Sequence, residues 1–245
     1  KGYLTAATDV DVDFSNPKYY FDSSIYANRV FDSKGVADPS VEIKFGPNIK
    51  DWPEMTALTD DMVLKVVSEI HDPVTTTDEL IPSGETSSFR SNPLGLAEFT
   101  LSRKDPEYVG KAKAVQLGEK ARVAGEDIYA ALPEAKEVFE KINQKFTVDP
   151  KTTQIGSMIY AVKPGDGSAR EQAASCQKVL GGMANIAKEY ATKRYRSNLI
   201  NWGMLPFLYP DEIPFENGDY ILIKDIKKAI ANKDEVIKAY VVSKD

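Results

Sequence analysis

The stretch that decides the fold is Lys163-Pro164-Gly165-Asp166-Gly167-Ser168-Ala169-Arg170-Glu171-Gln172. An apolar run, Ile155 to Val162, precedes it and predicts a strand, and the Ala- and Glu-containing segment after it predicts a helix. The two glycines allow a sharp turn and a close backbone approach to a ligand, because glycine has no Cβ. Ser168 is expected at or near the helix N-cap, where free N–H groups and the helix dipole attract anions.

Arg170 strengthens this interpretation, since its guanidinium matches a carboxylate or a phosphate. The same pattern is also typical of an ordinary loop with a capping serine and a solvated arginine, because short glycine-rich matches are common. The local pattern alone leaves both interpretations open.

Composition limits the class of protein. The chain has 245 residues, enough for one large or two small domains, and 42 % are hydrophobic, so a sizeable core can form. A net charge of −6 argues against a nucleic-acid binder that depends on many phosphate contacts. The single cysteine, Cys176, excludes an internal disulfide and a multi-cysteine zinc or iron–sulfur site made by this chain alone. His71 is the single histidine, so a multi-histidine metal site is excluded as well.

The sequence shows no pattern of a membrane span or of a signal peptide. We therefore expect a soluble, cytoplasmic protein with no membrane partner and no nucleic-acid partner. The chain opens at Lys1 without a methionine, which favours a fragment or a processed piece.

Two regions are predicted along the chain. Residues 1–57 are rich in Asp, Ser, Asn, Pro and Tyr, and are interpreted as an extended arm or linker. Residues 58–245 alternate apolar strand-like runs with helical patterns, which predicts one α/β domain.

The predicted strands are residues 62–70, 155–162, 183–187, 220–223 and 235–242. Several helices are predicted within residues 105–146, and one of them begins at Pro133. Further helices are predicted at residues 171–180, 190–202 and 225–231. Residues 72–92 predict a long polar loop, either functional or simply solvated. The basic cluster Lys193, Arg194 and Arg196 is interpreted as a solvated face or an interface within a larger protein.

Several motifs together resemble the C-terminal swivelling domain of the aconitase family. They are Gly165-Asp166-Gly167-Ser168-Ala169-Arg170-Glu171, then Leu180-Gly181-Gly182, and Arg196-Ser197-Asn198-Leu199-Ile200-Asn201-Trp202-Gly203-Met204-Leu205-Pro206. A second block, Thr76-Thr77-Asp78 with Arg90 further on, is similar to the family's Thr-Thr-Asp-His-Ile block and its downstream arginine. The resemblance covers roughly residues 64–206.

The resemblance implies a swivelling β/β/α domain with a mixed sheet and surrounding helices. In the family, three cysteines on other domains hold a [4Fe-4S] cluster over which this domain closes. The resemblance therefore implies that residues 1–57 lead from upstream domains, on the same polypeptide or on a separate subunit. It also implies that the upstream domains bind the cluster and that this chain contributes no metal ligand. This chain alone would then be inactive.

The resemblance also assigns roles to single residues. Ser168 matches the catalytic base, and Asp78 matches an active-site acid. Arg170 and Arg90 match arginines that bind substrate carboxylates, and Ala169 stands at a substrate-binding position where the family carries serine. A serine hydroxyl is a very poor base unless backbone N–H groups and a guanidinium stabilise its alkoxide in a dry site. A glycine loop at a helix start beside Arg170 contains those parts.

The implied function is that of a hydro-lyase, the reversible dehydration and hydration of a tricarboxylic acid such as citrate or isocitrate through cis-aconitate. Ala169, Gln172 and Glu79 depart from the family pattern and leave the choice of acid open. One alternative is the small domain of an isopropylmalate, homoaconitate or methylcitrate type dehydratase, and another is a non-catalytic homologue. Arg90 favours aconitase over the small-domain dehydratases, because it resembles the loop arginine of the aconitase branch of the family.

Overall fold

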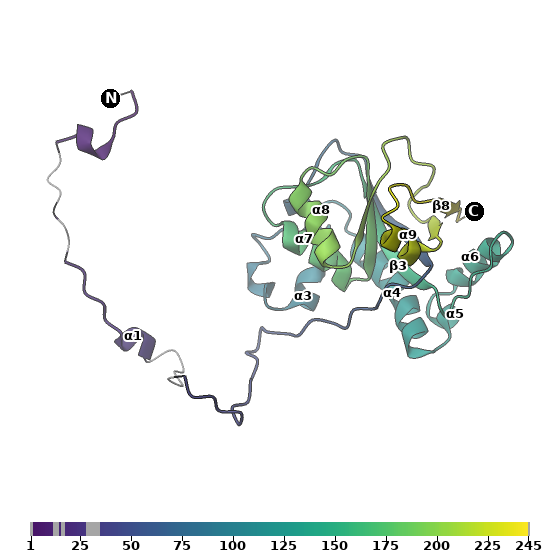
Figure 1. The fold of residues 1–245 in the computed structure, drawn as a ribbon, viewed down its shortest axis with the longest axis horizontal. Coiled ribbons are helices and arrows are strands. Elements are labelled where there is room, and N and C mark those ends of the chain that lie inside the picture. The colour runs from purple at the N-terminus through teal and green to yellow at the C-terminus, as the bar shows by residue number, and fades with distance from the viewer. Residues whose placement is uncertain (1, 12–14, 16–17, 28–34, 245) are drawn as a thin grey trace. The chain divides into compact units, whose positions relative to one another are not determined.

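The computed structural model describes residues 2–11, 15, 18–27 and 35–244 (Figure 1). The chain divides into two units, Lys1–Lys44 and Phe45–Asp245. Within the first unit, the described elements are a single 3-10 turn, η1 (Ala7–Asp9), and one short helix, α1 (Ser24–Ala27). The second unit contains the sheet and the remaining helices.

A six-stranded mixed sheet forms the centre of the second unit. Its strands are β1 (Met62–Ile70), β3 (Gln154–Ala161), β5 (Gly182–Ala187), β6 (Leu205–Leu208), β7 (Tyr220–Ile223) and β8 (Ala239–Val242). They lie in the order β6-β5-β3-β1-β7-β8. The pairs from β6 to β1 are parallel, whereas β7 runs antiparallel to both of its neighbours. The predicted α/β class with a mixed sheet is confirmed.

The central strands are apolar because both faces of the sheet are covered. All eight residues of β3 are buried, as expected for a strand in the middle of a largely parallel sheet. In β1, Met62 and Leu64 belong to a core cluster that includes Ile226, while Val63 and Val67 belong to the cluster on the opposite face. Because side chains alternate between the two faces of the strand, β1 contributes residues to two separate cores.

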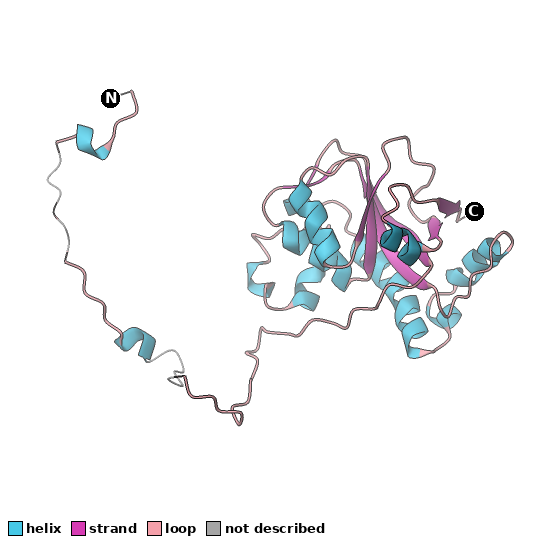
Figure 2. Ribbon diagram, viewed as in Figure 1, coloured by secondary structure: helices cyan, strands magenta, loops and turns pink. Residues whose placement is uncertain are grey.

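Helices enclose the sheet (Figure 2). They are α2 (Thr77–Leu80), α3 (Pro93–Ala97), α4 (Tyr108–Ala124), α5 (Ile128–Ala131), α6 (Glu134–Asn143), α7 (Arg170–Val179), α8 (Lys193–Asn201) and α9 (Ile226–Asn232). Buried residues of α3 to α8 join the core cluster that contains Val63, and Ile226 of α9 joins the other. Helices α7 and α8 lie side by side (Figure 1). The surrounding helices that were predicted are confirmed.

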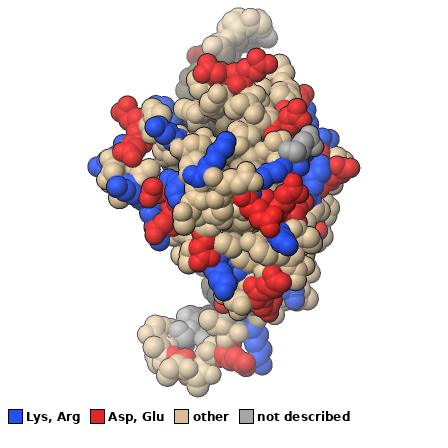
Figure 3. All heavy atoms as spheres, turned by 90° about the vertical axis from the view of Figure 1, so that its right-hand side faces the viewer, with Lys and Arg blue, Asp and Glu red and all other residues tan. Residues whose placement is uncertain are grey.

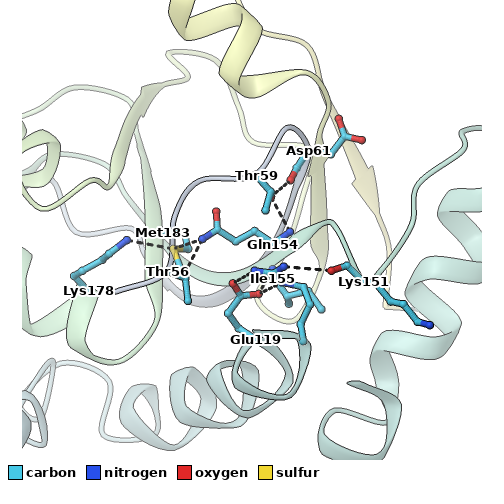
Figure 4. A network of polar contacts seen from close by, with 10 residues as sticks. Thr56, Thr59, Asp61, Glu119, Lys151, Gln154, Ile155, Lys178 and Met183 are labelled. Atoms are coloured by element: carbon cyan, nitrogen blue, oxygen red, sulfur yellow. Dashed lines mark hydrogen bonds and ion pairs between the residues drawn. The ribbon is translucent and has the colours of Figure 1, made fainter. Parts of the chain in front are cut away.

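A buried carboxylate fixes α4 to the start of β3 (Figure 4). Glu119 is 4 % exposed, pairs with Arg122 over 2.7 Å between Oε1 and Nη2, and accepts a hydrogen bond from Ile155 N at 2.9 Å. A buried charge of this kind is stable only when it is paired and hydrogen-bonded, and Glu119 has both kinds of partner.

Residues 45–58 belong to the second unit by their contacts. The rings of Trp52 and Trp202 lie 4.5 Å apart between centroids, and Gln154 Nε2 donates to Thr56 Oγ1 at 3.0 Å. Lys50 N donates to Ser91 O at 2.9 Å. This part of the chain therefore runs along the helices and the starts of the strands.

Most predicted elements are confirmed to within a residue or two, and four details are corrected. The helix predicted from residue 190 begins at Lys193, because Thr192 caps it, and the last strand is only Ala239–Val242. Residues 72–92 are not irregular throughout: they form β2 (Thr75–Thr76), α2 and a 3-10 turn at Ser87–Phe89. Strand β6 was not predicted.

Acidic and basic side chains are interspersed on the face that carries α6 and β8 (Figure 3). Among the residues that the structure describes, no helix combines the length and the apolar character needed to cross a bilayer.

Candidate functional site

The glycine loop lies at the carboxyl end of β3, next to the segment that follows β1. Strands β1 and β3 are parallel neighbours, so their carboxyl ends meet at one edge of the sheet. There β4 (Pro164–Asp166) pairs with β2 in parallel, with Thr75 opposite Pro164 and Thr76 opposite Asp166. The two sequence blocks that carried the resemblance are therefore brought together.

Both loop glycines adopt backbone conformations that L-residues rarely adopt. Gly165 has φ +96°, and a Cβ there would lie 2.3 Å from Tyr195 Cγ. Gly167 has φ +125°, and a Cβ there would lie 2.2 Å from Thr77 Oγ1. The close approach that the glycines permit is thus to side chains of the fold itself, rather than to a ligand as the sequence suggested.

Ser168 lies one residue before the N-cap of α7. The N-cap is Ala169, which offers no side-chain cap, and Arg170 N donates to Ser168 O at 2.9 Å. Ser168 is therefore near the N-cap, as predicted, but it does not act as a capping serine. Its side chain is exposed, and no hydrogen bond of its hydroxyl is found among the described residues.

A hollow of about 350 Å³ opens beside Ser168, between the first turn of α7 and one side of α8. Its walls carry three cations and one carboxylate. The lining residues are Ser168, Arg170, Glu171, Lys193, Arg194, Ser197, Asn198 and Asn201. The arrangement favours anions, because cationic side chains and free N–H groups at a helix start reinforce each other.

A single threonine brings the second helix to this hollow. Thr192 Oγ1 accepts from Tyr195 N at 3.2 Å as the N-cap of α8, and donates to Gly165 O at 3.2 Å. This places Lys193 and Arg194 on the wall. The sequence pattern favoured a solvated face or an interface for both residues. The signal that could have placed them at the site was Thr192, a capping threonine directly before the basic run.

Arg170 has an unmet hydrogen-bond donor. Its Nε is buried, and it has no hydrogen-bond partner among the residues that the structure describes. By contrast, Arg103 and Arg122 are both engaged with carboxylates. A buried guanidinium N–H without a partner is costly. Because Arg170 also borders the hollow, its guanidinium could bind a carboxylate there.

Two other predicted site residues lie outside the hollow. Arg90 is exposed and lines a separate small cavity with Glu171, Gln172 and Cys176, so Glu171 borders both cavities. Asp78 is exposed on the first turn of α2, and its carboxylate pairs with Arg103. The structure therefore brings Ser168, Ala169 and Arg170 together at the start of α7, with Arg90 and Asp78 on neighbouring segments.

The departure at Glu79 has a structural explanation. Glu79 N donates to Thr76 Oγ1 at 3.2 Å, and Thr76 N donates to Glu79 Oε2 at 2.7 Å. This reciprocal capping box closes the first turn of α2. The hydrogen bond from Thr76 N is the main cause that lowers the pKa of Glu79 below its ordinary value.

Thr76→Ala is expected to reduce the free energy of unfolding by about 1 kcal/mol, the usual loss for an N-cap threonine. Urea denaturation measures the change. Thr152→Ala is the control, because Thr152 is exposed and its hydroxyl donates only to Asp149 O at 3.3 Å within a turn. Equal stabilities of the two variants would contradict the capping role.

The described residues offer no group of three His, Cys, Asp or Glu side chains that could hold a metal ion. Cys176 is buried, and burial raises the pKa of its thiol to about 12. One protonated, enclosed thiol does not suit a [4Fe-4S] cluster, which needs several thiolates.

These features define a class: an α/β domain that holds a cationic hollow against a glycine loop at the carboxyl edge of its sheet. Residues 132–212 match the model of the aconitase C-terminal domain family. The methanogen homoaconitase small subunit of Methanocaldococcus jannaschii is 42 % identical over 94 residues, which cover 36 % of this chain and 53 % of that protein. The chain thus spans about half the length of the curated relative it matches.

Residues 132–212 are therefore similar to an aconitase C-terminal domain, in agreement with the resemblance. A crystal structure of 3-isopropylmalate dehydratase from Methanocaldococcus jannaschii is also similar, with 23 % identity and a TM-score of 0.42 over 75 % of this chain and 83 % of that one.

Proposed function

We propose that this chain supplies the C-terminal swivelling part of a hydro-lyase that dehydrates and rehydrates a hydroxy polycarboxylic acid. The observation that carries the proposal is the cationic hollow beside Ser168, which is bordered by Arg170, Lys193 and Arg194. Such a hollow suits a substrate with several carboxylates.

Ser168 acts in this proposal as the base. Its Oγ takes the proton from the carbon next to a substrate carboxylate. The free N–H groups at the start of α7 and the guanidinium of Arg170 stabilise the alkoxide before that transfer. Closure of other domains over the exposed Ser168 would exclude water, and this makes those electrostatic contacts stronger.

The substrate of this proposal is an acid of the homoaconitate or isopropylmalate type. The relative that matches is a homoaconitase small subunit, which supports that alternative better than citrate. Ala169 agrees, because it removes one hydroxyl that the family's citrate-binding loop would offer. The partner in the proposal is a large subunit or a set of upstream domains that binds the [4Fe-4S] cluster.

The test is an assay of the complete protein with its partner domains, reconstituted with iron and sulfide. Hydration of homoaconitate lowers the ultraviolet absorbance of its double bond, whereas dehydration of 3-isopropylmalate, methylcitrate and citrate creates a double bond and raises the absorbance, so one readout follows all four acids. Fastest turnover of homoaconitate or 3-isopropylmalate is expected. If citrate is fastest, the substrate assignment fails, and if a complete cluster assembles without turnover of any acid, the enzyme proposal fails.

Arg194→Gln in that protein is expected to raise KM about tenfold with little change in kcat, because one exposed cation contributes mainly to ground-state binding. Steady-state kinetics measure the change. Arg196→Gln is the matched control, since Arg196 lies on the same helix but does not line the hollow. Equal KM values for both variants would show that Arg194 does not bind the substrate.

A further inference from the structure

A third cavity lies at the other end of α7, away from the glycine loop. It has a volume of about 530 Å³. It is lined by Met55, Thr56, Leu58, Lys178, Ile200 and neighbouring residues of the turn at 201–205, with Ile230 of α9. The parallel strands begin near this edge of the sheet, whereas Ser168 lies at the edge where they end. Asn201 borders both cavities, but Lys178 and Ser168 lie at opposite ends of α7.

The walls of this cavity are mainly apolar, and one buried amine is part of them. Lys178 is only 7 % exposed, and its Nζ lies 3.4 Å from the sulfur of Met183 (Figure 4). Among the described residues, no carboxylate lies within ion-pair distance of it. A buried ammonium without a counter-ion is unfavourable.

Burial accordingly lowers the pKa of Lys178, and the charge of Glu119 opposes this only in part. Glu119 is already paired with Arg122 and hydrogen-bonded to Ile155 N. Its hydrogen bond to the sulfur of Met183, a weak acceptor, uses one of the three N–H donors of the ammonium, and no other hydrogen bond of Nζ is found among the described residues.

The floor below Lys178 is polar but too small for a ligand. Gln154 Nε2 donates to Thr56 Oγ1 at 3.0 Å and contacts the sulfur of Met183 at 3.4 Å, while its Oε1 has no hydrogen-bond partner among the described residues (Figure 4). The space there is about 20 Å³, the size of one water molecule. A ligand must therefore reach Lys178 from the larger cavity.

We propose that this cavity is a binding site for a small monocarboxylate with an aliphatic body. The carboxylate accepts from Lys178 Nζ, and the aliphatic part lies against Leu58, Met204 and Leu205. A single cation among apolar walls matches one negative charge joined to an apolar chain. Inorganic phosphate fits poorly, because its oxygens would face the apolar walls without donors.

Calorimetric titration of the full protein with hexanoate, hexan-1-ol and inorganic phosphate tests the proposal. Hexanoate is expected to bind about tenfold to a hundredfold more tightly than hexan-1-ol, the range of a charge-assisted hydrogen bond. Phosphate is expected not to bind there. Lys178→Met should abolish the preference for hexanoate, and Lys178→Arg should retain it. Equal affinities for the acid and the alcohol, or no effect of Lys178→Met, would overturn the proposal.

If Lys178→Met does not fold, a variant at the protein surface can still test whether hexanoate binds in this cavity. Ile230 is 46 % exposed at the mouth of the cavity, so Ile230→Glu should fold and should weaken hexanoate binding by repulsion. Val236→Glu is the matched control, because Val236 is 85 % exposed and does not line the cavity. If both glutamate variants bind hexanoate equally, the acid does not occupy this cavity. Activity of the hydro-lyase does not enter either measurement, so failure here is distinct from failure of the proposed function.

Discussion

Gly165→Ala is expected to lower the free energy of unfolding by about 3 kcal/mol or more. The new methyl group would lie 2.3 Å from the ring of Tyr195, at a backbone φ of +96°. Overpacking a filled core costs about 1–3 kcal/mol, and the left-handed backbone adds about 1–2 kcal/mol for an L-residue. Tyr195 cannot move aside easily, because it is fully buried and its Oη accepts hydrogen bonds from Gln177 and Asn185, both at 2.9 Å.

Gly110→Ala is the control for that experiment, with the opposite expected sign. Gly110 lies inside α4, and no atom lies within 4 Å of a Cβ built there. Alanine should therefore stabilise the helix by about 0.5–1 kcal/mol. Urea denaturation of both variants gives the comparison. A Gly165→Ala protein as stable as the parent would show that the loop does not pack on Tyr195 in solution.

Ser168→Ala in the complete hydro-lyase is expected to reduce kcat by about a thousandfold, within the range that a positioned general base contributes. KM should change little, because Arg170, Lys193 and Arg194 keep the cationic wall intact. The protein should remain as stable as the parent, since Ser168 is exposed and does not cap α7. Stopped assays of turnover and a urea titration together measure these effects.

Ser197→Ala is the matched control for the serine experiment. Ser197 lines the same hollow, but its hydroxyl already donates to Lys193 O at 2.9 Å. Its removal should change kcat by about threefold at most, because no charge develops on that oxygen. Comparable losses for both serine variants would show that Ser168 contributes only to the polarity of the hollow.

Long apolar runs made most of the fold predictable from sequence. Strand β1 is a nearly continuous, β-branched apolar run, and α6 repeats apolar residues at helical spacing, so their positions follow from local residues. Strand β6 was missed because Leu205–Leu208 is short, contains a proline and lies at the sheet edge. The short elements of residues 75–89 were missed because side-chain caps and pairing with β4, rather than a hydrophobic pattern, hold them in place.

The candidate site was predictable only where one segment builds it. The start of α7 with Ser168 and Arg170 follows from a contiguous stretch of sequence. Lys193 and Arg194 reach the hollow through a hydrogen bond between Thr192 and the glycine loop, which is a tertiary contact. The roles assigned to Asp78 and Arg90 by the resemblance remain predictions, since neither lines the hollow.

The pairing of β1 has a consequence for how this protein is made in the cell. Met62 lies opposite Gln154 on one side and opposite Ile223 on the other, so both partners of this central strand are distant in sequence. Pairings of such high contact order form slowly. During synthesis β1 emerges from the ribosome long before either partner. One of its backbone edges stays unpaired until β3 has been translated, and the other until β7 has been translated. A nascent chain of this kind depends on chaperones or on rapid late collapse to avoid aggregation.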